Sequence, residues 1–287
     1  MSVAGTENLL MVRLHTSDFD SWVYDHEAAA ELADQKGAKK GDVHTTKRRL
    51  AKEATKPMTD ITTAAYFYHT AVTMPTGNKG ERIITTNLYE TYNAKMQEFK
   101  TQLENAKAEF APLYYSKWVP ESKERLNGMA KDEDYPPVEK VLERFQMSWS
   151  FLPLPTSCAL PSTLLAEQAE SIRKSVEQEM ESLQKNAMKS LWDRMYDAVA
   201  HMAERMGSEG KLFGSVIGNV KDLTELLKSL NFSNDPELES LRQKVEARLS
   251  GFDPEDLRKN RTIRNQVAEE AKAIAFEIST KRKLRVE

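Results

Sequence analysis

The chain has 287 residues, of which 40% are hydrophobic and 30% are charged, with only 11 glycines and 11 prolines. This composition is typical of long solvated helices, and the length allows a substantial core. The net charge of −3 excludes an overall electrostatic attraction of the protein to polyanions. The single cysteine, Cys158, excludes an internal disulfide or a multi-cysteine zinc site. No apolar run approaches the roughly 18 residues of a membrane span and no signal-peptide pattern opens the chain, so we expect a cytoplasmic protein without membrane contacts.

The first half of the chain mixes short strands with helices. Residues 9–15 and 144–152 alternate apolar and polar side chains, which predicts two short strands that pair in a small sheet. Further elements are expected between them: helices over 18–34, 59–73, 87–111 and 138–143, a short helix within 43–55 closed by Pro57, and an extended segment over 81–85.

The second half is dominated by one helical repeat. Apolar side chains recur from Leu165 to Met206 at a mean spacing of about 3.7 residues, a period that no strand can produce. Pro161 and Gly207 fit the first turn and the end of a single helix roughly 70 Å long. Three more helices are expected over 211–230, 236–250 and 254–280, the last two opening with Asp-Pro-Glu.

The predicted fold class is therefore mainly α, a bundle of long helices with a small two-stranded β element. The proline-rich stretch 153–161 divides it into an N-terminal mixed part, 1–155, and a helical part, 156–287.

The long apolar stripe has two interpretations, the spine of a monomeric helical domain or an assembly surface. Its methionines form an adaptable face, and an aromatic pair widens the stripe beyond what one layer of helices usually covers. We therefore expect a homo-oligomer with a coiled-coil type of interface. The residues assigned to it are Met180, Leu191, Trp192, Met195, Tyr196, Met202 and Met206.

Motifs of known chemistry are missing from the sequence. It contains no P-loop, no dinucleotide-binding glycine pattern, no HExxH and no GxSxG, and its five histidines are scattered. We expect no metal, no cofactor and no catalytic residue. An enzyme without a recognisable motif is the minority alternative.

One segment departs from its surroundings in charge. Eight basic and two acidic residues lie between Lys36 and Lys56, a net charge of +6 in a chain whose total is −3. Aromatic residues follow it, and basic groups beside exposed aromatic rings suit single-stranded nucleic acid. The alternative is a solvated loop followed by core tyrosines, and Tyr68 and Tyr92 are expected to be partly buried. The candidate binding residues are Lys39, Lys40, Lys47, Arg48, Arg49, Lys52, Lys56, Tyr66, Lys79 and Arg82.

Several stretches, in this order, resemble an uncharacterised family of helical proteins of similar length encoded by bacteriophages and mobile elements. They are residues 26–41 (HEAAAELADQKGAKKG), 64–75 (AAYFYHTAVTMP), 135–155, 191–206 and 226–249. Relatives in that family lie beside recombination and single-strand-binding genes, or beside MoxR-type AAA+ ATPases. The resemblance implies a role in DNA metabolism or as an adaptor to such an ATPase. The loop PTGNKGER departs from the family pattern, in which a Trp- and Asp-containing turn is expected.

The sequence therefore leads to two hypotheses. The first is a non-enzymatic, oligomeric phage or mobile-element protein that binds single-stranded DNA or RNA in replication or recombination. The alternative is a helical protein–protein adaptor or structural subunit, with an AAA+ ATPase as one partner.

Overall fold

The computed structural model describes residues 6–154, 160–161, 163–208 and 215–286, so the sequence-based statements on Cys158 and on the start of the helix predicted over 211–230 lie outside it. The chain forms two compact units. Unit 1 contains Met1–Arg13, Thr70–Thr91 and Ser150–Glu287, and unit 2 contains Leu14–His69 and Tyr92–Trp149. These units differ from the parts 1–155 and 156–287 predicted from the sequence, because the first half of the chain contributes strands and helix ends to unit 1.

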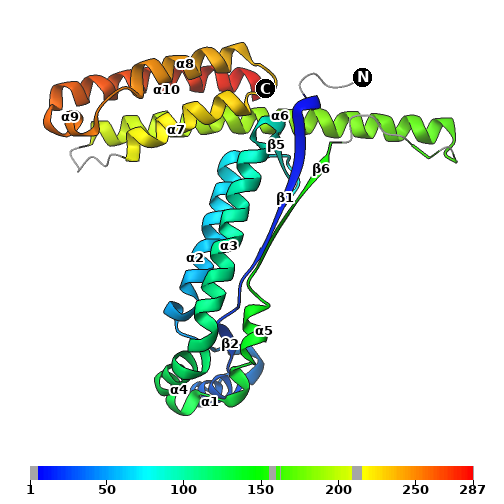
Figure 1. Ribbon diagram of the computed structural model, residues 1–287, viewed down its shortest axis with the longest axis vertical. Helices are drawn as coiled ribbons and strands as arrows, with labels where there is room; N and C mark the ends of the chain where they lie inside the picture. Colours follow the sequence, from blue (N-terminus) through cyan, green and yellow to red (C-terminus); the bar gives the residue numbers. More distant parts are fainter. Residues whose placement is uncertain (1–5, 155–159, 162, 209–214, 287) are drawn as a thin grey trace. The chain divides into compact units, whose positions relative to one another are not determined.

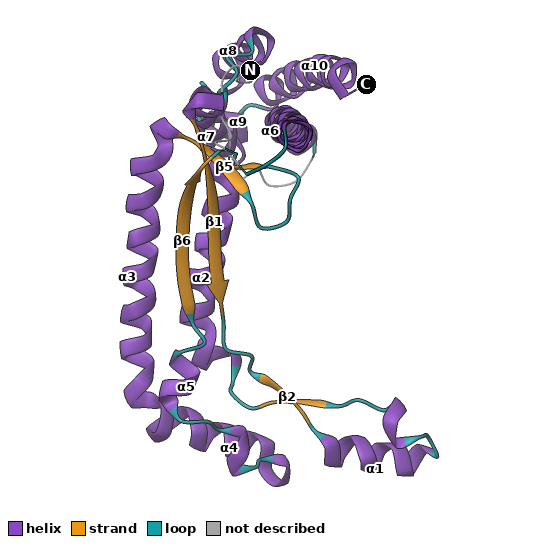
Figure 2. Ribbon diagram, turned by 90° about the vertical axis from the view of Figure 1, so that its right-hand side faces the viewer, coloured by secondary structure: helices purple, strands orange, loops and turns teal. Residues whose placement is uncertain are grey.

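The fold is mainly α with a small sheet, as predicted. The two predicted strands are β1 (Leu9–Ser17) and β6 (Gln146–Pro153), and they are neighbours in a four-stranded sheet of order β4-β5-β1-β6. Figure 2 shows β1 and β6 side by side. The sheet is larger than predicted, because β4 (Met74–Pro75) and β5 (Arg82–Thr85) form an antiparallel hairpin whose second strand pairs with β1.

Unit 1 is built on α6 (Ala166–Gly207), which runs unbroken for 42 residues as the apolar period predicted. The prediction that Pro161 lies in its first turn is wrong, because Leu165 is extended and the helix begins at Ala166. Three helices pack along it or on one another in Figure 1: α7 (Ser215–Leu230), α8 (Pro236–Leu249) and α10 (Arg261–Val286). Asp235 caps α8 by accepting hydrogen bonds from the N–H groups of Glu237 and Leu238, which explains the Asp-Pro-Glu start.

The helix predicted over 254–280 is in fact two helices, α9 (Pro254–Lys259) and α10. Asn260 between them is extended, and its side-chain oxygen accepts hydrogen bonds from the N–H groups of Thr262 and Ile263. An asparagine that caps a second helix interrupts the first one, because its own backbone cannot be helical at the same time.

The apolar stripe of α6 is covered by helices of the same chain. The residues predicted to join two copies lie in the core of unit 1: Met180, Leu191, Trp192, Met195, Met202 and Met206 are each at most 4% exposed, and Tyr196 packs against them. Arg282 of α10 lies over the Tyr196 ring at 4.7 Å and pairs with Asp193 at 3.0 Å. A contact between copies therefore requires other residues.

Unit 2 holds most of α2 (Lys52–Val72) and α3 (Tyr89–Leu113), which pack through the rings of Tyr68 and Tyr92 at 5.9 Å. A π-helical turn (Tyr114–Trp118), α4 (Val119–Leu126) and α5 (Val138–Leu142) follow. Short 3-10 turns occupy Thr6–Asn8, Lys40–Asp42, Thr86–Leu88, Asn127–Met129 and Asp132–Asp134.

Two sequence-based boundaries in unit 2 are wrong. The helix predicted over 18–34 is a strand, β2 (Trp22–Tyr24), followed by α1 (His26–Lys36), because Asp25 caps α1 by accepting from Ala28 N–H. The short helix predicted within 43–55 is instead strand β3 (Thr46–Arg48) followed by the first turn of α2, and Pro57 lies inside α2 and does not close a helix. The carbonyl that its missing N–H would bond belongs to Glu53, an exposed residue in the first turn, where water can replace that bond.

Candidate nucleic-acid interface

The basic segment 36–56 is spread over four elements of unit 2. It covers the end of α1, a 3-10 turn, strand β3 (Thr46–Arg48) and the first turns of α2. Lys39 and Lys40 are exposed, and Lys40 pairs with Asp34 at 3.2 Å. Lys52 and Lys56 are exposed on α2, where Lys56 pairs with Asp60 one turn later.

Lys47, by contrast, is a buried structural residue. Its side chain is 3% exposed, and its Nζ lies 2.9 Å from the Asp134 carboxylate, 3.4 Å from that of Asp25 and 2.6 Å from the Met129 carbonyl oxygen. Burial lowers the pKa of Lys47, but the hydrogen bond and the negative charges of Asp134 and Asp25 outweigh it, so the net shift is upward. Lys47 is therefore not a candidate phosphate contact.

Arg49 and Arg82 also have structural partners. Arg49 donates to the Asp20 carbonyl oxygen at 2.7 Å and stacks on Phe19 at 4.2 Å. Arg82, in unit 1, donates to the Thr73 side chain and to the carbonyl oxygens of Thr70 and Thr73. Arg194 donates to the same two carbonyl oxygens; burial, and then the charge of Arg82, lower the pKa of Arg194 to about 10.

The remaining cations of β3 and α2 line one pocket of about 260 Å³ in unit 2, which we call the Trp22 pocket. Its walls come from the turn after β1, from β2 and β3, and from the first turns of α2. The lining residues are Asp18, Phe19, Asp20, Ser21, Trp22, Arg48, Lys52, Thr55, Lys56, Thr59 and Asp60. Three sequence-predicted residues, Arg48, Lys52 and Lys56, thus meet at one place.

A stacked pair of side chains forms the rim of the Trp22 pocket. Trp22 and Arg48 are partners across the β2–β3 ladder, and the Arg48 guanidinium carbon lies 4.6 Å from the centroid of the Trp22 ring. Trp22 remains 49% exposed. The buried Nε of Arg48 has no hydrogen-bond partner among the described residues. An exposed aromatic ring beside a guanidinium is suited to a flat ligand that can stack on the ring.

Trp22 is not among the site residues predicted from the sequence, because residues 18–34 were predicted to form one helix. The signal was present: Trp-Val-Tyr is a strand-forming triplet, and the following Asp25 with Glu27 two residues later is a helix start.

The predicted stacking residue, Tyr66, is 54% exposed on α2 and lies edge-to-face with Phe67, which is 65% exposed. Positions 52, 56, 59, 63 and 66 follow the helical period, so Tyr66 shares the α2 face that carries Lys52 and Lys56. The ten residues from Lys56 to Tyr66 span about 15 Å. Tyr68 is half-buried and Tyr92 is fully buried, as expected for core tyrosines.

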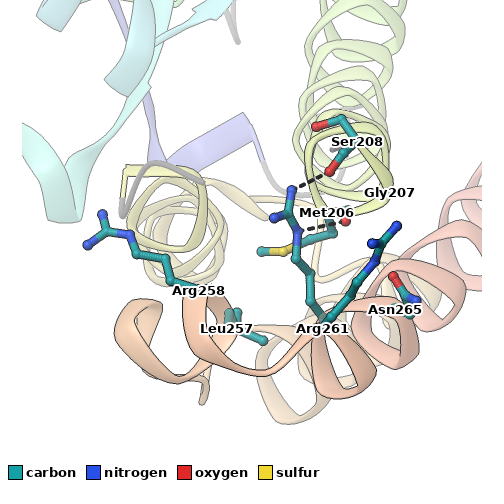
Figure 3. A pocket seen from close by; sticks show the side chains of 8 residues that line it. Met206, Gly207, Ser208, Leu257, Arg258, Arg261 and Asn265 are labelled. Carbon is teal, nitrogen blue, oxygen red and sulfur yellow. Dashed lines mark hydrogen bonds between the residues drawn. The ribbon is translucent and has the colours of Figure 1, made fainter. Parts of the chain in front are cut away.

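Lys79 belongs to unit 1, where it is exposed in the β4–β5 loop. A second pocket of about 180 Å³, also in unit 1, lies at the end of α6 and is lined by Arg258, Arg261 and Arg264 among others. Figure 3 shows this pocket, with Met206 and Ser208 at the end of α6. Arg264 donates to the carbonyl oxygens of Met206, Arg205 and Ser208. Arg258 extends away from Arg261 in the same view and pairs with Glu255 at 2.7 Å. Arg264 therefore caps the C-terminal end of α6.

Comparison with known proteins gives no relative: no family model, no curated protein and no solved structure matches this chain. Among the helices of the described residues, none combines the length and the apolar character that a membrane crossing requires. The same residues hold no group of three or more His, Cys, Asp or Glu side chains arranged to bind a metal ion.

Proposed function

We propose that this protein binds single-stranded nucleic acid without catalysing a reaction, through the Trp22 pocket and the α2 face that leads to Tyr66. By the resemblance noted above, it acts in DNA replication or recombination of a phage or mobile element, in the cytoplasm of a bacterial host. The observation that carries the proposal is the exposed Trp22–Arg48 stack beside Lys52 and Lys56.

The chemistry of this surface supports a single strand over a duplex. A base stacks on an exposed ring only when it is not already stacked inside a double helix, and each such contact is worth about 1–3 kcal/mol. Lys52 and Lys56 supply the positive charge that phosphates require, and Tyr66 offers a second exposed ring on the same face of α2.

The test is a fluorescence anisotropy titration of the full chain with a labelled single-stranded 30-mer at several salt concentrations. Lys52→Glu combined with Lys56→Glu should weaken binding and lower the slope of log K against log salt by about 1.4, since each phosphate contact on a single strand contributes about 0.7. The matched control is Lys100→Glu with Lys140→Glu, which makes the same charge change at exposed residues outside the Trp22 pocket.

The wild-type chain failing to bind at low salt, or the control variant losing as much affinity as Lys52→Glu/Lys56→Glu, would refute the proposal. Charge reversal at Lys47 or Arg49 is unsuitable for this test. Both side chains hold unit 2 together, so their loss would mimic loss of binding.

A helical adaptor or structural subunit is the second candidate function, and the first turns of α6 favour it. Leu165 and Ile172 are 69% and 37% exposed, and they continue the apolar stripe that is buried from Met180 onward. These turns extend past α7, α8 and α10 in Figure 1. Light scattering separates the two functions: a dimer that Leu165→Glu/Ile172→Glu converts to a monomer supports the adaptor, and a monomer at all concentrations opposes it.

A further inference from the structure

The Trp22 pocket carries hydrogen-bond acceptors as well as cations. Asp18 and Asp20 line it, and each is held by one carboxylate oxygen. Asp18 Oδ1 accepts from the Thr62 hydroxyl at 2.9 Å, and Asp20 Oδ1 accepts from the Trp22 N–H at 2.8 Å. The Oδ2 atom of each makes no hydrogen bond within the described residues. Both aspartates are exposed, so one carboxylate oxygen of each is available to a donor.

The formal charges of this pocket balance. Three carboxylates, with Asp60 as the third, stand against Arg48, Lys52 and Lys56. A pocket without net charge does not favour a simple anion. It favours a ligand that brings a negative group for the lysines, a flat ring for Trp22 and N–H donors for the aspartates. A nucleotide within a strand has these three parts.

The pKa of the Asp18 carboxyl agrees with a side chain that has too few hydrogen-bond donors around it. Burial raises the pKa of the Asp18 carboxyl, and the hydrogen bond from Thr62 only partly opposes this. A donor edge placed against Asp18 would stabilise its charged form.

We propose that the Trp22 pocket takes one base of the bound strand and selects guanine. This inference rests on the proposed function. The Watson–Crick edge of guanine carries two adjacent donors, N1–H and the N2 amino group, one for the available oxygen of each aspartate. Thymine and uracil offer one N–H between two carbonyl oxygens, which a carboxylate repels. Adenine and cytosine present one amino group beside a ring nitrogen acceptor, so they satisfy only half of the site.

The experiment compares the affinity of the full chain for single-stranded oligonucleotides that differ at a few positions. The reference is a thymine 20-mer. In each of the others, three separated thymines are replaced by guanine, inosine, 7-deazaguanine, adenine or cytosine. Inosine lacks the N2 amino group of guanine, whereas 7-deazaguanine keeps its Watson–Crick edge. Isolated guanines avoid four-stranded structures.

Guanine and 7-deazaguanine should bind about 5- to 150-fold tighter than thymine, the fold-change that corresponds to the roughly 1–3 kcal/mol of a bidentate base contact. The affinities for the inosine, adenine and cytosine strands should lie between those for the guanine and thymine strands. Asp18→Asn with Asp20→Asn should remove the guanine preference, so that this variant binds the guanine strand and the thymine 20-mer with equal affinity. Asparagine keeps the Oδ1 acceptor that Thr62 and the Trp22 N–H use, so the fold contacts survive.

Asp42→Asn with Glu53→Gln is the matched control, because it removes the same charge from exposed residues outside the pocket and should keep the preference. Equal affinity for all strands, or a preference for another base, refutes the guanine site while the proposed function stands. Failure to bind any strand refutes the proposed function itself.

Discussion

Replacing Lys47 by methionine tests whether the middle of the basic segment is structural. Lys47 is the cation of a buried cluster with Asp25 and Asp134, whose side chains are 5% and 6% exposed. Methionine keeps much of the side-chain volume but removes the charge and the donor to the Met129 carbonyl oxygen. The two carboxylates are then left buried without a cation.

We expect Lys47→Met to lower the free energy of unfolding at pH 7 by about 3–5 kcal/mol, the usual cost of breaking a buried ion pair. Because the pKa of Lys47 is raised, its contribution is complete below its ordinary value of 10.5 and is lost as pH rises through the higher folded value. The pKa of Asp25 is lowered, first by the Ala28 N–H and also by Lys47, so its contribution is present above 3.8 and is lost as pH falls below that. Neutral pH therefore shows the full effect.

The assay is urea unfolding at pH 7 and pH 5. With a slope of about 2–3 kcal/mol per molar, the Lys47→Met midpoint should drop by about 1–2 M. The loss should be similar at pH 5, because both pH values lie between 3.8 and 10.5, where the contributions of Asp25 and Lys47 are complete. Lys40→Met, which removes an exposed ion pair with Asp34, should cost less than about 1 kcal/mol. Equal small losses for both variants would show that the buried cluster contributes little.

Three other outcomes are expected. Tyr114→Phe should lower the free energy of unfolding by about 1 kcal/mol, because it removes the hydrogen bond to the Pro136 carbonyl oxygen. Burial raises the pKa of Tyr114 to about 12, so an absorbance titration of the variant should lack a phenol that ionises there. The stabilisation by Tyr114 is complete below pH 10 and lost above pH 12. Leu191→Ala should cost about 2–5 kcal/mol by thermal or urea unfolding, whereas Ile172→Ala, at 37% exposed, should cost far less. Gly77→Ala should destabilise unit 1 by about 1–3 kcal/mol, because the φ of Gly77 is +104° and a Cβ there would lie 2.6 Å from Asn186 Nδ2. Gly41→Ala, which has open space around it, should be nearly neutral.

The sequence alone determined the elements whose signals are local. The helical period of α6, the Asp235 cap of α8 and the alternation in β1 and β6 each arise within a few turns or residues. Each of these elements formed, although α6 begins at Ala166 and not at Pro161. The errors came where a local signal competed with another. Asp25 and Asn260 cap new helices inside segments that read as continuous ones, and Pro57 was tolerated inside α2.

Tertiary structure decided which side chains of similar sequence became core and which became surface. Lys47 and Lys52 belong to the same basic run, but Asp25 and Asp134, distant along the chain, bury the first and leave the second in the Trp22 pocket. The stripe from Met180 to Met206 required a cover, and no period indicates whether that cover comes from α7 and α10 or from a second copy. The periodicity indicates which residues avoid water, because that preference belongs to each side chain. Which segment covers those residues depends on long-range contacts, and the local pattern does not contain them.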